Sequence, residues 1–241
     1  VSAFLLALGH IEGVGYYISA PAKRGLWTGY ILFWLLLVVY VRILKPWRLR
    51  SRPYRVKELR QDCSDCWTLV LQPQGHTGMR FQPGQFAWLT LGESPFHIKE
   101  HPFSFSSSAV CQDRVEFTIK ELGDFTRTIK NTRVGEIAYL DGPYGVFTVD
   151  RYPNAPGFVF IAGGVGVAPI ISIFRTLAGR HEPRSLLLIY GKNCWGELML
   201  KEELQTLPER LDMRVVHVIK NPPTEWEGES GYLTPEVLNN H

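Results

Sequence analysis

The sequence predicts a membrane-anchored, multi-domain protein: one or two transmembrane helices, then an antiparallel β-barrel, then an α/β domain built on a parallel sheet. Three observations predict it: an apolar stretch near the N-terminus, short β-rich segments up to residue 152, and alternating strand and helix patterns after it. The 241 residues are 45% hydrophobic and 20% charged, which argues against disorder and allows several domains. We expect domains at 1–46, 47–152 and 153–241.

The apolar stretch 26–44 has the length and composition of a transmembrane helix. Its 19 residues include one charged residue, Arg42, whose long stem can reach the headgroups. A bilayer core of about 30 Å takes roughly 20 apolar residues in a helix, and Trp27 and Trp47 lie where interfacial aromatic residues are common. The alternative, a buried helix of a globular protein, usually has a polar face, and this stretch has none.

Basic residues flank the stretch unevenly, and this asymmetry predicts an orientation. Lys23 and Arg24 lie close before it, whereas a larger basic group follows: Lys45, Arg48, Arg50, Arg52, Arg55 and Lys57. By the positive-inside rule, the C-terminal bulk of the chain is cytoplasmic and the lipid bilayer is a partner. The apolar segment 1–9 is then the remainder of a helix that runs outward. A signal peptide ending at residue 22 is the alternative, but it would lack a basic region before its apolar core.

His10 falls in the outer half of the predicted membrane region. An ionisable side chain at membrane depth is costly and is treated as a candidate functional residue. Imidazole is also a common ligand of haem iron. A histidine hydrogen-bonded at the outer interface explains the same position, so both interpretations stay open.

Four short segments predict the barrel, because they are rich in β-branched and aromatic residues and are bounded by Gly and Pro. They are 66–73, 85–91, 115–122 and 136–143. The stretch 154–156, "NAP", is typical of a joint between domains.

The region after the joint alternates between buried strands and amphipathic helices. Strands are predicted at 157–164, 185–191 and 213–220, and helices at 167–180 and 196–207. This order indicates a parallel sheet with right-handed crossovers, which places the ligand site at the carboxyl ends of the strands.

A glycine-rich turn, "AGGVGVAP", lies at the first of these strand ends. Gly163, Gly164 and Gly166 allow a sharp turn and a close approach of ligand to backbone, and Pro169 suits the start of the next helix. The free N–H groups of a helix start favour a phosphate, so the turn predicts dinucleotide binding. A purely structural tight turn is the alternative, since the motif is not G-x-G-x-x-G.

The stretch "EHPFSFSSS" at 100–108 predicts a strand with two different faces. Pro102 biases His101 towards an extended backbone, so His101 and Phe103 share one face while Ser104 lies on the other. Such a strand could hold a flat cofactor. Taken alone, an ordinary strand explains the pattern equally simply.

Cysteine and charge content exclude other classes. Cys63 and Cys66 form the one Cys-x-x-C pair, without the second pair or the histidines that a zinc site needs, so two reduced thiols are expected over a metal or redox site. The net charge of +3 is small and the basic residues gather beside the apolar stretch, which argues against a nucleic-acid partner.

Several segments together resemble a known family: "HPFSFSS", "IKELGDFTRTI", "DGPYGVF" and "FIAGGVGVAPIISI". In order and spacing they are similar to the ferric reductase and NADPH oxidase family, membrane relatives of ferredoxin-NADP reductase. The resemblance covers nearly the whole chain. It implies FAD in the barrel, NADPH or NADH in the α/β domain, and haem b in the full-length protein.

The resemblance implies roles for the first motif. His101 and Pro102 would bind FAD, with His101 near its phosphates. Phe103 would lie against the isoalloxazine ring. Ser104 would contact flavin N5 and is our candidate catalytic residue.

The other motifs carry further implied roles. Lys120 would contribute to cofactor binding, and Gly123 and Thr126 would offer an amide and a hydroxyl to the FAD pyrophosphate. The glycine turn with Pro169 would bind the nicotinamide dinucleotide. His10 would be a ligand of the outer haem iron.

The implied reaction moves a hydride from NAD(P)H to FAD and then single electrons to haem and an outer acceptor, which would be a ferric chelate, dioxygen or a quinone. Lys192 could pair with a 2′-phosphate, with Arg175 or Arg180 adding charge, but a solvated lysine fits as well.

Two other functions stay open: a membrane-anchored ferredoxin-reductase-type flavoprotein serving a cytoplasmic partner, and a flavin-binding regulatory module without turnover.

The sequence departs from the family at both ends. His10 is the one histidine in the predicted membrane region, although the family holds haem between pairs of histidines. The family's C-terminal Cys-Gly-Pro motif is absent. We therefore expect a chain truncated at both ends, whose haem site needs the missing membrane helices of a parent protein.

Overall fold

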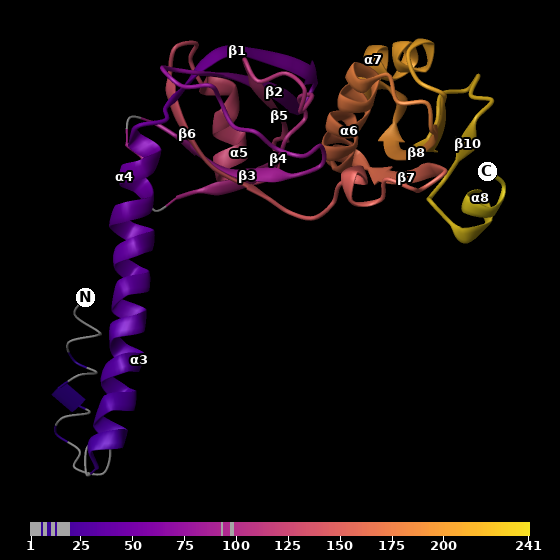
Figure 1. Ribbon diagram of the computed structural model, residues 1–241. Coiled ribbons are helices and arrows are strands. Elements are labelled where there is room, and N and C mark those ends of the chain that lie inside the picture. The colour runs from indigo at the N-terminus through magenta and orange to yellow at the C-terminus, as the bar shows by residue number, and fades with distance from the viewer. Residues whose placement is uncertain (1–5, 7–8, 11–12, 14–19, 93, 97–98) are drawn as a thin grey trace. The chain divides into compact units, whose positions relative to one another are not determined.

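The computed structural model describes all residues except 1–5, 7–8, 11–12, 14–19, 93 and 97–98 (Figure 1). It divides into two compact units: residues 1–51 with 94–98, and residues 52–93 with 99–241. The first boundary follows residue 51, compared with the expected 46. The expected boundary at 152 lies inside the second unit, so the two predicted cytoplasmic domains pack as one body.

One continuous helix of 30 residues dominates the first unit. It consists of α3 (Pro21–Val39), a π-helical turn (Tyr40–Leu44) and α4 (Lys45–Arg50). Pro46 explains the π-helical turn, because it cannot donate a hydrogen bond to residue 42 and its ring would clash there. The Lys45 amide reaches back to the Tyr40 carbonyl instead, which widens the helix by one residue.

The central part of this helix, residues 25–41, carries no charged side chain, and most of its apolar side chains are exposed. Ile31 and Pro46 are its buried residues, and 6% of its most apolar window is buried. Among the described residues it is the one helix long and apolar enough to cross a bilayer. A core helix of a soluble protein would bury such side chains, so the exposure supports the predicted span, which remains a prediction.

The second unit begins with a six-stranded antiparallel sheet in the order β4-β3-β6-β1-β2-β5 (Figure 1). A bridge between Phe105 and Phe117 joins the segment after β4 to β5, so the two edges of the sheet meet as in a barrel. The predicted barrel-like sheet is therefore confirmed. Its strands are β1 (Tyr54–Cys63), β2 (Cys66–Pro73), β3 (Phe86–Leu91), β4 (His101–Ser104), β5 (Val115–Lys120) and β6 (Ile137–Tyr144).

Strand β1 was not predicted, because its sequence "YRVKELRQDC" is rich in charge. Its Tyr54 and Val56 point into the barrel core, while Arg55 and Lys57 are exposed. The pairing with β2 along its length holds it in the sheet, so tertiary contacts outweigh its weak local signal.

The rest of the second unit is a four-stranded parallel sheet in the order β10-β9-β8-β7. This confirms the predicted strand and helix alternation. The elements are β7 (Gly157–Gly163), α6 (Val167–Arg180), β8 (Ser185–Cys194), α7 (Lys201–Thr206), β9 (Met213–Asn221), β10 (Glu229–Ser230) and α8 (Pro235–Asn239).

Helix α6 covers one face of this sheet. Phe174 of α6 meets Phe160 of β7 edge to face with ring centroids 5.1 Å apart, and the apolar side chains around them form the core. Strand β7 is an edge strand of this sheet, and its other face carries Val159 and Ile161, which are 64% and 53% exposed.

The second predicted helix, 196–207, is shorter than expected. The α-helical part is Lys201–Thr206, and Trp195–Glu197 form a separate 3₁₀ turn. Residues 198–200 separate the two, and Leu200, the last of them, has φ of 54°, in the left-handed region, which interrupts the helical path.

Candidate functional site

The glycine turn follows β7 at the carboxyl ends of the parallel strands. Gly164 has φ of +52°, a conformation that strains other residues, and Gly163, Gly164 and Gly166 all border open space. The Tyr190 hydroxyl of β8 donates a hydrogen bond of 3.1 Å to the Gly164 carbonyl. Burial raises the pKa of Tyr190, so this donor keeps its proton. The turn is thus held with its glycines facing space that a ligand could occupy.

A pocket of about 350 Å³ opens beside this turn. Lysines from three strands line it: Lys120 of β5, Lys192 of β8 and Lys220 of β9. Of the described residues, no Asp or Glu is among those that line it. The pocket therefore favours an anionic ligand.

Lys192 gives the strongest sign of an anion-binding site. Its residue is 8% exposed, and its Nζ has no hydrogen-bond partner among the described residues. A buried ammonium without a partner is unfavourable unless an anion completes the site. The predicted contribution of Lys192 to nucleotide binding is consistent with this position.

Lys120 connects the barrel to the same pocket. It forms an ion pair of 3.2 Å with Asp65, and Asp65 also accepts hydrogen bonds from the thiols of Cys63 (3.4 Å) and Cys66 (3.3 Å). Burial opposes ionisation of Asp65, but these hydrogen bonds together keep its pKa below the usual value. Burial raises the pKa of Cys66, which favours the protonated thiol expected from the sequence.

The "HPFS" motif forms β4 as predicted. The ring of His101 stacks on Phe125, with centroids 3.7 Å apart and planes at 10°, and Phe103 lies 6.1 Å from the same ring. His101 Nε2 is buried without a hydrogen-bond partner among the described residues. Burial, and then the charge of Lys99, lower the pKa of His101, so it is neutral near pH 7. The motif thus offers flat aromatic surfaces and an unsatisfied ring nitrogen, which fit a flavin.

Gly123 and Thr126 lie at the start of the short helix α5 (Asp124–Thr128). The Thr126 hydroxyl accepts hydrogen bonds from the amides of Leu122 (2.9 Å) and Gly123 (2.8 Å). These groups satisfy one another, so a pyrophosphate at this turn would have to replace internal hydrogen bonds. The roles implied for Gly123 and Thr126 stay predictions.

The structure brings some predicted residues together and leaves others apart. Lys120, Gly163, Gly164 and Lys192 line one pocket, whereas Gly166 and Pro169 are not among its lining residues. Ser104 is half-buried opposite Phe86 of β3, also outside that lining. His10 lies in a helical, exposed position of the first unit.

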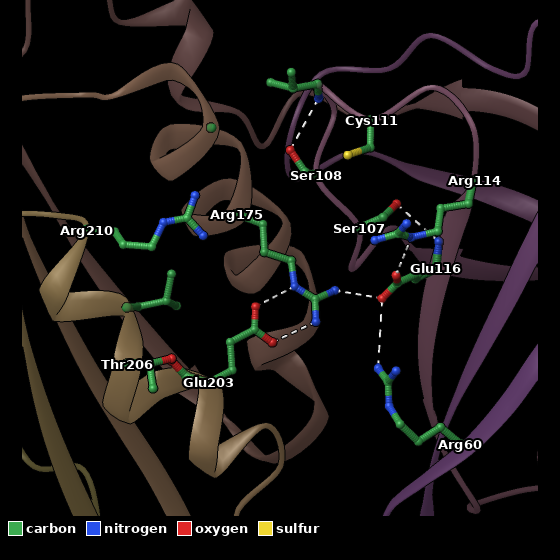
Figure 2. A pocket seen from close by; sticks show the side chains of 13 residues that line it. Arg60, Ser107, Ser108, Cys111, Arg114, Glu116, Arg175, Glu203, Thr206 and Arg210 are labelled. Atoms are coloured by element: carbon green, nitrogen blue, oxygen red, sulfur yellow. Dashed lines mark hydrogen bonds and ion pairs between the residues drawn. The ribbon is translucent and has the colours of Figure 1, made fainter.

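Arg175 and Arg180 lie elsewhere than the sequence suggested. Arg175 does not line the lysine pocket; it contacts Glu203 and Glu116 in a second pocket of about 570 Å³ (Figure 2). Arg180 instead pairs with Asp150 at 2.6 Å. Glu203 accepts two hydrogen bonds from Arg175. The sequence carries no local signal for these contacts, because the partners are 28 to 59 residues apart.

Comparison with known families defines the class. Residues 54–148 match the FAD-binding domain family, and residues 160–241 match the oxidoreductase NAD-binding domain family. These ranges coincide with the barrel and the parallel sheet. The chain thus combines an FAD-binding and an NAD-binding domain in a ferredoxin-reductase-like fold. Kinship with ferric reductases and NADPH oxidases in particular remains a prediction.

Individual relatives are electron-transfer reductases by name. NADH-cytochrome b5 reductase 1 of Candida albicans is 33% identical over 127 residues, which are 50% of this chain and 42% of that protein. The reductase component of propane 2-monooxygenase from Rhodococcus jostii is 30% identical over 162 residues, 66% of this chain and 42% of that protein. The chain thus spans less than half the length of these relatives.

A solved structure shows the same fold. The ferredoxin NADP+ reductase from Neisseria gonorrhoeae, with bound FAD and NADP, superposes with a TM-score of 0.66 at 24% identity, covering 78% of this chain and 75% of that one. The flavohaemoglobin-like FAD/NAD-binding domain of nitric oxide dioxygenase from Vibrio cholerae gives a TM-score of 0.66 at 20% identity, covering 76% and 80%.

Proposed function

We propose that this chain is the flavin- and nicotinamide-binding part of a reductase that oxidises NAD(P)H and passes electrons singly to an acceptor. The observation that carries the proposal is the shared pocket, in which Lys120 of the barrel meets Gly163, Gly164 and Lys192 of the parallel sheet. The two matched domains support it. FAD, when bound, would supply hydride acceptance and single-electron release.

The chain's own residues would bind and orient the reactants. Lys192 and Lys120 would hold the anionic part of the nucleotide, and Gly163 and Gly164 would let it approach the backbone. Phe103 would cover a flat ring. Ser104 would donate or accept a hydrogen bond at the reacting edge, and its assignment as catalytic rests on the family resemblance.

His101 would act as a neutral hydrogen-bonding group. Its lowered pKa means that it carries no charge near pH 7, so it would contact an FAD phosphate or ring as a hydrogen-bond partner and not as a cation. This refines the expectation that His101 faces the phosphates.

The charge of the pocket favours NADPH over NADH. Three lysines line it, and a 2′-phosphate adds two negative charges at most to the ligand. We expect NADPH to bind more tightly than NADH, and expect the difference to shrink as the salt concentration rises. Equal affinities at low salt would contradict this preference.

The proposed function is tested by anaerobic mixing of FAD-loaded protein with NADPH. Bleaching of the oxidised flavin absorbance within seconds is the expected result. Protein that binds FAD and NADPH but stays yellow would contradict the reductase and support a regulatory flavin-binding module.

We also propose that the helix 21–50 anchors the chain in a membrane with the second unit in the cytoplasm, and that His10 contributes to a haem b site. The apolar, exposed helix and the basic residues after it support the anchor. The acceptor would then lie on the outer side, as ferric iron or dioxygen. These assignments rest on sequence and on family resemblance.

Absorption spectra of membrane fractions from cells that express the parent protein test the haem assignment. Haem absorbance that disappears in His10→Ala, while flavin absorbance is kept, is expected. Haem absorbance that persists unchanged in His10→Ala would exclude His10 as a ligand.

A protein acceptor is the second candidate, favoured by the names of the relatives. The name of the first relative refers to cytochrome b5, and the name of the second refers to propane 2-monooxygenase, so each name refers to another protein. In that case the chain would reduce a small cytoplasmic redox protein such as a cytochrome b5, and FAD-loaded protein would do so without a haem of its own.

A further inference from the structure

Arg175 joins three separate segments of the second unit through one guanidinium. Figure 2 shows two of these contacts, to Glu203 and to Glu116. Its Nε and Nη2 each donate a hydrogen bond of 2.6 Å to Glu203 of α7. Its Nη1 donates to Glu116 of β5 at 2.8 Å and to the Ser106 carbonyl at 2.7 Å. A planar guanidinium can make this set of contacts, whereas a lysine ammonium cannot.

The ion pair between Arg175 and Glu116 is largely shielded from water. The side chains of Arg175 and Glu116 are 18% and 9% exposed. Glu116 also accepts a hydrogen bond of 3.1 Å from Arg114, and Arg60 lies 4.0 Å from its other oxygen. Because this ion pair is shielded from water and hydrogen-bonded on several sides, its two side chains are held in one geometry. The side chains of a solvent-exposed pair are not held in this way.

Helix α6 carries this contact from one part of the site to the other. It begins directly after the glycine turn, and Arg175 lies within it. Ser172 donates to the Ser107 carbonyl at 2.7 Å, and the Ala109 amide donates to Thr176 at 2.8 Å. The segment 106–109 follows the "HPFS" strand β4 within a few residues.

We propose that Arg175 is a positioning residue that fixes the glycine turn, through α6, relative to the strand β4 that carries His101, Phe103 and Ser104. The proposal rests on the proposed function, because it assigns Arg175 to the alignment of the two reacting rings. Hydride transfer requires reacting atoms about 3–3.5 Å apart, and a displacement of about 1 Å can slow it about 100-fold.

Arg180 is the matched control on the same helix. It also forms a two-pronged ion pair, with Asp150 at 2.6 and 3.1 Å, but its side chain is 41% exposed and its partner lies in the short 3₁₀ turn at 149–151. Arg180→Lys removes a similar contact without touching the segment after β4.

The first experiment measures amide hydrogen exchange in the FAD-free chain. Arg175→Lys should speed exchange in the segment 105–110, including the Ala109 amide, by about threefold or more, since this segment loses its anchor to α6. Arg180→Lys should leave it unchanged. Unchanged exchange in Arg175→Lys would overturn the proposal.

The second experiment measures the rate of anaerobic flavin reduction at saturating nucleotide. The rate is measured once with NADPH and once with NADPH deuterated at the transferred position. We expect Arg175→Lys to slow the step about 10-fold or more and to increase the isotope effect, with FAD and NADPH dissociation constants within about threefold of wild type. Arg180→Lys should match wild type. A merely stabilising role for Arg175 would lower unfolding temperature while leaving the rate per bound flavin unchanged, and that result would overturn the proposal.

The two proposals fail in different ways. If wild-type protein binds FAD and NADPH but is never reduced, the proposed function fails. If wild type is reduced and Arg175→Lys is reduced equally fast, the positioning role fails alone. If Arg175→Lys does not fold, Glu203→Gln replaces it, because this variant keeps the guanidinium and its contacts with the barrel. We expect Glu203→Gln to slow flavin reduction more mildly. An unchanged rate in Glu203→Gln would contradict the positioning role of Arg175.

Discussion

The two pockets of the second unit use positive charge in opposite ways. The pocket beside the glycine turn is lined by lysines, and the ammonium of Lys192 is buried with no partner among the described residues. The pocket beside α6 contains arginines (Figure 2), and Arg175 makes four hydrogen bonds within the protein.

This difference assigns ligand binding to the lysine-lined pocket and the positioning of protein segments to the pocket beside α6. A cation left without a partner is destabilising until an anion arrives, so the lysine pocket is suited to a ligand. A cation with all its partners in the protein holds segments together and has little to offer a ligand. Substitutions in the two pockets should therefore have opposite effects on stability and binding.

The largest effect is expected for Lys192→Met. NADPH binding should weaken about 30-fold, because a hydrogen bond to a charged group contributes about 1.5–3 kcal/mol. The ligand-free protein should be as stable as wild type or more stable, since an unpaired buried charge is removed. Calorimetric titration and urea unfolding measure both quantities.

Lys220→Met is the control for Lys192→Met. Lys220 is exposed and its Nζ lies 4.8 Å from the centre of the Tyr232 ring, so a few-fold loss of affinity at most is expected. If Lys192→Met bound NADPH normally and was less stable than wild type, the lysine would be structural.

Glu116→Gln should have the opposite effects to Lys192→Met: lower stability and nearly unchanged NADPH affinity. The substitution leaves Arg175 and Arg114 with a neutral partner in a shielded site, and we expect the free energy of unfolding to fall by about 2 kcal/mol. NADPH affinity should change by less than about twofold, because Glu116 does not line the lysine pocket. A strong loss of affinity at unchanged stability would contradict the separation.

A smaller effect is expected for Gly164→Ala. The added Cβ has space, but φ of +52° costs about 1–2 kcal/mol for a residue with a side chain. Gly166→Ala is the matched control, since Gly166 has φ of −60° and equally open surroundings. Equal stability of the two variants in urea unfolding would show that the turn relaxes without strain.

The smallest effect is a dependence of stability on pH. Burial, and then the charge of Lys201, lower the pKa of His217, and the pKa of His101 is lowered as well. The unfolded chain therefore binds protons that the folded chain does not, and stability should fall as the pH falls below about 6.5, by at most about 1.4 kcal/mol per pH unit for each histidine. Urea unfolding from pH 7.5 to 5.5 measures this, and His217→Phe should reduce the slope.

Local sequence predicted the parts of the site that depend on local conformation. The glycine turn requires a left-handed residue, which Gly164 supplies, and the strand and helix around it have clear periodicity. The "HPFS" strand was also visible, because Pro102 favours an extended chain. These signals lie within a few residues of the structure they specify.

The rest depended on long-range partners. Arg175 was expected near a nucleotide phosphate, but its carboxylate partners lie 28 and 59 residues away in the chain. Strand β1 was missed because its pairing with β2, and not its own composition, keeps it extended. The left-handed Leu200, which shortens the helix predicted at 196–207, has no signature in its residue type.

The uncovered face of strand β7 has a practical consequence. Strand β7 lies at an edge, with Val159 and Ile161 turned to solvent on the face that α6 does not cover. An exposed edge strand beside exposed apolar side chains can pair with a strand of another copy of the chain. Purified chain should consequently self-associate as its concentration rises, and polar substitutions at these two positions should keep it monomeric.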